Sequence, residues 1–131
     1  MKKKTVLIVE DELDMRIFLS TLLETSGYRP VVTKDGHDGM LKAKQVLPDL
    51  IILDVMMPGE GGVQMYRQLK SDDNLKNIPV IMLSAVAEKT FAHYLKMVNA
   101  RMVDPIPDPH AYIEKPPEAA ELLSIAAHLI G

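Results

Sequence analysis

The sequence predicts an α/β fold built on a parallel β-sheet. Four short apolar runs recur at residues 6–9, 50–53, 80–83 and, more weakly, 112–114, and each leads into a polar residue. Continuous apolar runs of this length are typical of strands buried on both faces, as in a parallel sheet. Strands and helical patterns alternate five times with short connections, which indicates an α/β domain with right-handed crossovers.

The first half of the chain contains two strand–helix pairs. An apolar pattern at helical spacing follows the first strand and stops at Gly27. Residues 30–34 form a short second strand, and Asp35-Gly36 then turns the chain. The second helix ends near Pro48, because a residue that precedes proline disfavours helical backbone.

The second half repeats the alternation three times. Apolar residues three or four positions apart, such as Val63 and Tyr66, predict each helix. In chain order, the expected elements are a strand at 50–53, a helix from 63, a strand at 80–83, a helix over 91–98, a strand at 112–114 and a helix over 122–130. We expect a single domain over residues 1–131.

One connection breaks this pattern. Between Asn99 and Ala111 the chain carries Pro105, Pro107 and Pro109, so neither a helix nor a central strand is expected there. Long irregular loops in compact domains are often functional. A rigid, extended surface loop at about residues 102–110 is nevertheless the favoured interpretation.

Composition excludes several functional classes. The absence of cysteine excludes disulfides and thiolate metal sites. The net charge of -3 argues against a nucleic-acid surface, which is usually basic. No apolar run approaches the roughly 18 residues of a membrane span, and the acidic residues from Glu10 onward end the apolar stretch that follows the N-terminal lysines. We expect a cytoplasmic protein without direct nucleic-acid binding or membrane insertion.

The polar residues at the strand ends predict a shared site. In a parallel sheet the carboxyl ends of all strands meet at one edge, where ligands bind. That edge would bring together Glu10, Asp11, Asp54, Ser84 and Lys115. Crowded carboxylates favour a cation, and an ammonium beside a hydroxyl suits an incoming anion. This set predicts a magnesium-assisted phosphoryl site.

Over essentially its whole length, the chain resembles the receiver domain of two-component response regulators. The resemblance places the family's acidic pair on Glu10-Asp11, its phosphoacceptor on Asp54 and its small glycine on Gly62. Its switch hydroxyl falls on Ser84, and its lysine falls on Lys115. The aromatic residue three positions before that lysine is Tyr112. The resemblance implies a flavodoxin-like, doubly wound five-stranded sheet of order 2-1-3-4-5 with five helices.

The resemblance also implies a role for each residue. Asp54 would accept a phosphoryl group from a phosphohistidine of a sensor histidine kinase or a histidine phosphotransfer protein. Mg²⁺ would be bound by Asp11, Asp54 and the main-chain carbonyl of Met56, with Glu10 acting through water. Lys115 would neutralise phosphoryl charge while Ser84 donates a hydrogen bond.

Family resemblance further implies a conformational switch that involves Ser84 and Tyr112. Phosphorylation would remodel the face formed by the fourth helix, fifth strand and fifth helix for a downstream protein. Met56 and Val86 flank the expected path of a hydrolytic water. Both are apolar, which predicts a slowly autodephosphorylating acyl phosphate, whereas the small Ala85 leaves the phosphoryl group open to a donor.

Plainer interpretations exist for each residue taken alone. Asp11 or Asp54 could cap a helix, Ser84 could satisfy backbone at a strand end, and Tyr112 could be a core aromatic. Glu12, like Asp14, is most simply an acid at a helix start.

Several whole-chain functions compete with the phosphoacceptor. One is a docking module that resembles a receiver but is not phosphorylated. Another is a hydrolase with an aspartyl nucleophile, although such enzymes commonly carry a second acid where this chain has Met56. A flavin-binding module is disfavoured because Glu10-Asp11-Glu12 would repel phosphate. For the phosphoacceptor we expect no conventional enzyme, since the domain would catalyse only its own phosphorylation and slow dephosphorylation.

Overall fold

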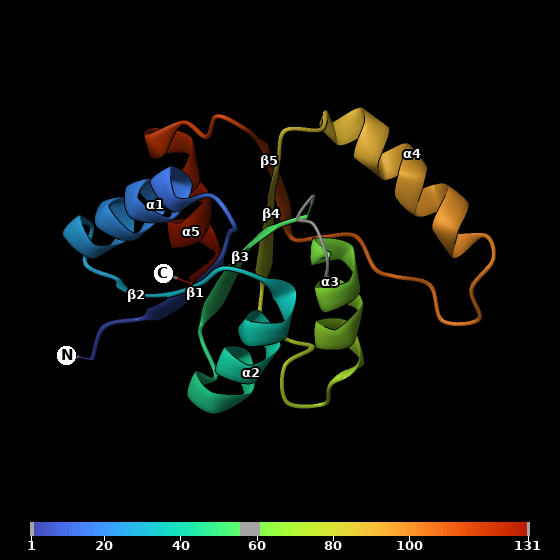
Figure 1. Ribbon diagram of the computed structural model, residues 1–131, viewed down its shortest axis with the longest axis horizontal. Coiled ribbons are helices and arrows are strands. Elements are labelled where there is room, and N and C mark those ends of the chain that lie inside the picture. The colour runs from blue at the N-terminus through green and yellow to red at the C-terminus, as the bar shows by residue number, and fades with distance from the viewer. Residues whose placement is uncertain (1, 56–60, 131) are drawn as a thin grey trace.

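The computed structural model describes residues 2–55 and 61–130 as five strands alternating with five helices (Figure 1). The strands are β1 (Thr5–Val9), β2 (Arg29–Thr33), β3 (Leu50–Asp54), β4 (Val80–Ser84) and β5 (Ala111–Glu114). The helices are α1 (Leu13–Thr25), α2 (Gly36–Val46), α3 (Gly62–Ser71), α4 (Glu88–Asn99) and α5 (Ala119–Ile130). The strands form one parallel sheet in the order β2-β1-β3-β4-β5, which confirms the expected fold.

Alternate residues of each central strand enter two separate cores, because successive side chains of a strand point to opposite faces. On one face Leu7 and Ile51 pack with α2, α3 and α4, and on the other Ile8 and Ile52 pack with α1 and α5. Figure 1 shows α1 and α5 on one side of the sheet and α2 and α3 on the other. Burial of both faces explains why the sequence of each strand is a continuous apolar run.

The strand register brings the carboxyl ends into line. Val9 of β1 lies opposite Leu53 of β3, and Asp54 lies opposite Leu83 of β4. Ser84 in turn lies opposite Glu114 of β5. Residues that end or immediately follow these strands therefore occupy one edge of the sheet.

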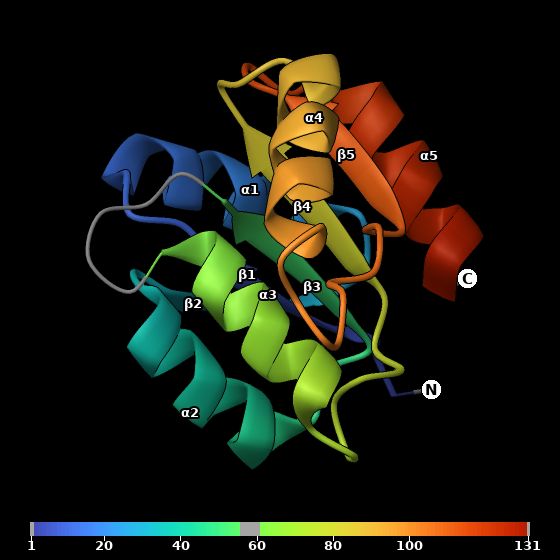
Figure 2. The same cartoon turned by 90° about the vertical axis from the view of Figure 1, so that its right-hand side faces the viewer.

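The proline-rich segment, residues 102–110, is mostly exposed and lacks regular structure, as expected for a surface loop, but one of its residues enters the core. Ile106 is only 5% exposed and joins the core beneath α4. Asn99 holds it there, because its amide donates to the Ile106 carbonyl at 2.9 Å and accepts from the Ile106 amide at 2.7 Å. The Tyr66 hydroxyl also donates to the Pro107 carbonyl at 2.9 Å. In Figure 2 this segment returns from the end of α4 toward β5. The segment is therefore a largely exposed loop that the buried Ile106 side chain anchors to the core.

Within the described ranges, every helix is too short or too polar to cross a lipid bilayer.

Candidate functional site

Residues at four strand ends form a cluster at the carboxyl edge of the sheet. Glu10 follows β1, Asp54 ends β3, Ser84 ends β4 and Lys115 follows β5. Glu10, Asp54 and Ser84 are each at most 4% exposed, whereas Asp11 beside Glu10 is exposed. The structure thus brings together the residues that the sequence places at this edge. Their partial burial strengthens electrostatic interactions among them.

Lys115 lies at the centre of this cluster. Its Nζ is 2.7 Å from Glu10 Oε1, 3.0 Å from Glu12 Oε1 and 3.1 Å from Asp54 Oδ2. Burial of Lys115 opposes its charge, but the hydrogen bonds to Glu10, Glu12 and Asp54 outweigh burial and raise its pKa. Lys115 is therefore a fixed cation shared by three carboxylates.

Glu10 is the most deeply buried acid of the cluster, at 1% exposure. Its Oε2 accepts a hydrogen bond from the Glu12 amide at 3.0 Å, while its buried Oε1 forms an ion pair with Lys115 Nζ at 2.7 Å. Burial, with a contribution from the charge of Asp54, raises the pKa of Glu10 to about 7 against the opposing effects of Lys115 and the Glu12 amide. Burial is therefore the main reason that Glu10 resists ionisation.

The acidic turn after β1 provides oxygen atoms for a cation. Carboxylate oxygens of Glu10, Asp11 and Glu12 all lie within 4.8 Å of one another. Magnesium prefers oxygen ligands and retains several waters, so one or two carboxylates suffice. The residues present therefore fit a divalent cation. The fourth expected ligand, Met56, lies outside the described residues, as does its expected influence on lifetime.

Two further residues support this turn, and the sequence analysis missed both roles. The sequence predicts only an acid at a helix start for Glu12. It is the N-cap residue of α1, but its side chain makes no capping bond and contacts Lys115. Arg16 donates from its guanidinium to the carbonyls of Glu10 and Asp11, at 2.9 Å each. Arg16 lies one turn into α1. Its spacing from Glu10 and Asp11 is the sequence feature that could have predicted these hydrogen bonds.

The helix-capping interpretation of the two aspartates is wrong. The N-cap of α1 is Glu12 and the N-cap of α3 is Gly61, so neither Asp11 nor Asp54 occupies such a position. Gly62, the first residue of α3, instead lies against the end of β3: a Cβ there would overlap the Asp54 carbonyl oxygen and the Val55 Cα. A glycine at this position lets α3 begin directly beside Asp54.

Ser84, a member of the cluster, is linked to Tyr112 through Val86. The Ser84 Oγ accepts a hydrogen bond from the Val86 amide at 3.0 Å, and the Tyr112 hydroxyl donates to the Val86 carbonyl at 2.6 Å. The Tyr112 ring stacks on Phe91 of α4, with 5.2 Å between centroids. Burial is the main reason that the pKa of Tyr112 is raised. Tyr112 therefore connects the residues around Ser84 to α4.

Comparison with known proteins identifies the family. Residues 6–127 match the response regulator receiver domain family. The polar-differentiation response regulator DivK of Brucella anthropi is 33% identical over 129 residues, covering 98% of this chain and 97% of that protein. The hybrid signal transduction histidine kinase D of Dictyostelium discoideum is 36% identical over 98% of this chain, which spans only 8% of that kinase's length.

Solved structures of receiver domains have the same fold as this chain. The receiver domain of a sensor histidine kinase from Pseudomonas aeruginosa, with a magnesium ion in its active-site cleft, aligns with a TM-score of 0.84 at 25% identity over 99% of both chains. Chemotaxis protein CheY4 of Vibrio cholerae shares the fold, with a TM-score of 0.83 at 24% identity over 98% of this chain and 99% of that one. The chain belongs to the response regulator receiver domains of two-component signalling systems.

Proposed function

We propose that Asp54 is the phosphoacceptor of this receiver domain and that Mg²⁺ assists the transfer. The observation that carries this proposal is the position of Lys115, whose Nζ lies 3.1 Å from Asp54 Oδ2 and contacts two further carboxylates. A nucleophilic carboxylate beside a fixed cation and a cation-binding acidic turn suits phosphoryl transfer, which depends on positioning and on neutralising negative charge.

The donor is a phosphohistidine on a sensor histidine kinase or a histidine phosphotransfer protein. An Asp54 carboxylate oxygen forms a bond to phosphorus while the phosphorus–nitrogen bond breaks, and the imidazole leaves with that electron pair. Lys115 neutralises charge on the transferred group, and the Ser84 hydroxyl donates to one of its oxygens. Asp11 and Asp54 would hold the magnesium ion, with Glu10 acting through water. When bound, the ion supplies positive charge to the phosphoryl oxygens.

The acyl phosphate is expected to decay slowly. Val86, which is half-buried and apolar, follows Ser84 by two residues and presents no side-chain group that would orient an attacking water. We expect a labelled, phosphorylated sample to retain its label for longer than seconds at neutral pH. Replacing Val86 by a polar residue should shorten that lifetime. In its phosphorylated state the domain would switch its interaction with a downstream protein through Ser84 and Tyr112.

Intact-mass spectrometry after incubation with acetyl phosphate and Mg²⁺ tests the proposal. The wild-type protein should gain one phosphoryl group, and Asp54→Asn should gain none. Asp14→Asn is the matched control, since Asp14 is an exposed acid in the first turn of α1. Chelation of the metal by EDTA should suppress the gain in mass.

Each alternative function predicts a different result. Equal labelling of Asp54→Asn would refute the assigned nucleophile. No labelling of the folded wild-type protein would favour a docking module that works without phosphorylation. Repeated turnover with steady release of phosphate would favour a hydrolase.

A further inference from the structure

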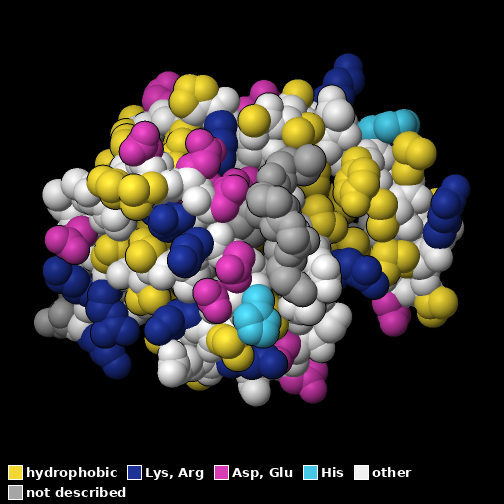
Figure 3. Space-filling model, viewed as in Figure 1, with side chains coloured by type: hydrophobic (Ala, Val, Ile, Leu, Met, Phe, Trp, Pro, Cys, Tyr) yellow, Lys and Arg dark blue, Asp and Glu magenta, His cyan; other side chains and the backbone are white. Residues whose placement is uncertain are grey.

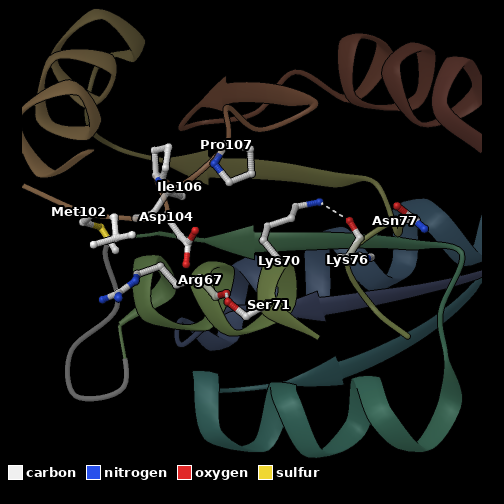
Figure 4. Close-up of a pocket in the computed structure, with 11 residues that line it drawn as sticks. Arg67, Lys70, Ser71, Lys76, Asn77, Met102, Asp104, Ile106 and Pro107 are labelled. Atoms are coloured by element: carbon white, nitrogen blue, oxygen red, sulfur yellow. Dashed lines mark hydrogen bonds between the residues drawn. The ribbon is translucent and has the colours of Figure 1, made fainter. Parts of the chain in front are cut away.

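A groove lies along α3 and α4, beside the proline-rich segment. It consists of two adjoining hollows of about 540 and 460 Å³ that share Arg67 and Met102. The first hollow lies between the C-terminal half of α3 and the segment (Figure 4), and the second lies against the C-terminal half of α4. Gly62 at the start of α3 contacts the acidic cluster, so this groove occupies the other end of that helix. We call it the α3–α4 groove.

The α3–α4 groove is basic, although the whole chain carries a net charge of -3. Arg67, Lys70 and Arg101 line it, and within residues 2–55 and 61–130 none of the three forms an ion pair. Lys70 is fixed: it donates to the carbonyls of Lys76 at 3.0 Å and Ile78 at 3.4 Å. Among the described residues that line the groove, Asp104 is the one carboxylate that opposes these charges. The groove therefore favours a negatively charged occupant.

The second hollow adds apolar surface. Tyr94 is 47% exposed and Met97 is 59% exposed, and both line it together with the half-buried Val98 and Met102. Figure 3 shows hydrophobic side chains at the surface over α4, with Lys and Arg side chains around them. Aromatic and methionine side chains flanked by arginines are the composition enriched at the centres of protein interfaces. A simple anion would leave this surface uncovered.

The wall of the groove is held in place before any ligand binds. Asn99 makes two hydrogen bonds to the backbone of Ile106, and Tyr66 makes one to Pro107. The Ile106 side chain is buried, which anchors the segment to the core. A wall that is already ordered reduces the entropy lost on binding.

We propose that the α3–α4 groove binds an acidic peptide segment of a partner protein that also carries apolar side chains. Carboxylates of the segment would pair with Arg67 and Arg101, and an apolar side chain would cover Met97 and Tyr94. Small molecules usually bind in enclosed pockets that bury most of their surface. Two joined hollows that are open to solvent suit a peptide better. This binding does not depend on phosphorylation of Asp54, so an experiment that refutes one of the two proposals leaves the other untouched.

Selection from a displayed library of random short peptides tests the inference on the unphosphorylated protein. Peptides that combine Asp or Glu with Leu, Phe or Met should be enriched. Synthetic copies should then bind roughly tenfold or more weakly to Arg67→Glu/Arg101→Glu, because like charges would face each other. Lys3→Glu/Arg29→Glu is the matched control, since both residues are exposed and lie outside the groove, and it should bind like wild type.

Further measurements separate other occupants. Met97→Ser should weaken the selected peptides, and their amide chemical-shift changes should fall on α3, α4 and residues 101–107. Selection of peptides without acidic residues would overturn the proposal. An equal loss of affinity in Arg67→Glu/Arg101→Glu and in Lys3→Glu/Arg29→Glu would also overturn it. Polyglutamate that binds as tightly as the selected peptides would show a plain anion site instead. Sedimentation that shows dimers lost in Arg67→Glu/Arg101→Glu would assign the groove to a second copy of the chain.

Discussion

The two ends of β5 lead into regions that are built in opposite ways. Its carboxyl end carries Lys115 into the acidic cluster, where each polar side chain directly ends or follows a strand and the sheet register sets its position. Its amino end follows the proline-rich segment, which lacks regular structure and is held by single side chains such as Asn99 and Tyr66. Interactions between charged side chains are the main feature of the first region, and packing against the core is the main feature of the second. Mutations in the first should therefore affect chemistry, and mutations in the second should affect stability.

Lys115→Met should have the largest effect, because it removes the cation that Glu10, Glu12 and Asp54 share. We expect the rate of phosphorylation by acetyl phosphate to fall by roughly 100-fold or more, as for other losses of a fixed electrostatic group. The measurement is the time course of mass gain with Mg²⁺ present. Lys89→Met, at an exposed lysine of α4, is the control and should react at the wild-type rate. A normal rate for Lys115→Met would remove the proposed role of this residue.

Ile106→Ala tests the packing side of the comparison. The side chain is 5% exposed within the core beneath α4, so its truncation should lower the free energy of unfolding by about 2–4 kcal/mol. Val103→Ala is the control, because Val103 is 97% exposed and should change stability by less than about 0.5 kcal/mol. Urea denaturation measures both. Under conditions where it is folded, Ile106→Ala should still phosphorylate at close to the wild-type rate; a large loss would mean that the two regions are not separable.

The contrast between the acidic cluster and the proline-rich segment also explains which positions the sequence could predict. The positions of Asp54, Ser84 and Lys115 follow from apolar runs, because parallel strands must end at one edge. The strand order came from family resemblance. Ile106 could not be found this way, since it stands alone between prolines and takes part in no periodic pattern. The contact of Glu12 with Lys115 joins residues 103 positions apart and depends on side-chain direction, which no local pattern records.

The pH dependence of stability should reveal the burial of Glu10 within the acidic cluster. The pKa of Glu10 is raised from 4.5 to about 7 in the folded state, so between these values the folded protein binds more protons than the unfolded chain. Stability should therefore fall as pH rises from about 4.5 to 7, by roughly 1–3 kcal/mol in total. Urea denaturation in metal-free buffer across this range measures the change.

Glu10→Gln should flatten this pH dependence, whereas Glu118→Gln, at an exposed acid, should not. Added Mg²⁺ should also reduce the slope, because a bound cation stabilises the ionised carboxylate. Stability of the wild-type protein that rises over the same pH range, with Glu10→Gln unchanged from wild type, would contradict the assigned environment of Glu10.

Tyr112→Phe should have the smallest effect and tests how the two regions communicate. It removes the 2.6 Å hydrogen bond to the Val86 carbonyl but keeps the ring stacked on Phe91, so stability should fall by about 1 kcal/mol. Tyr94→Phe, at an exposed tyrosine of α4, is the control and should be neutral. Because the carboxylates and not Tyr112 hold the Lys115 ammonium, the acceptance of phosphate should be unchanged. Amide chemical-shift changes in α4 on phosphorylation should instead shrink. Undiminished changes in α4 would show that the acidic cluster reaches this helix by another route.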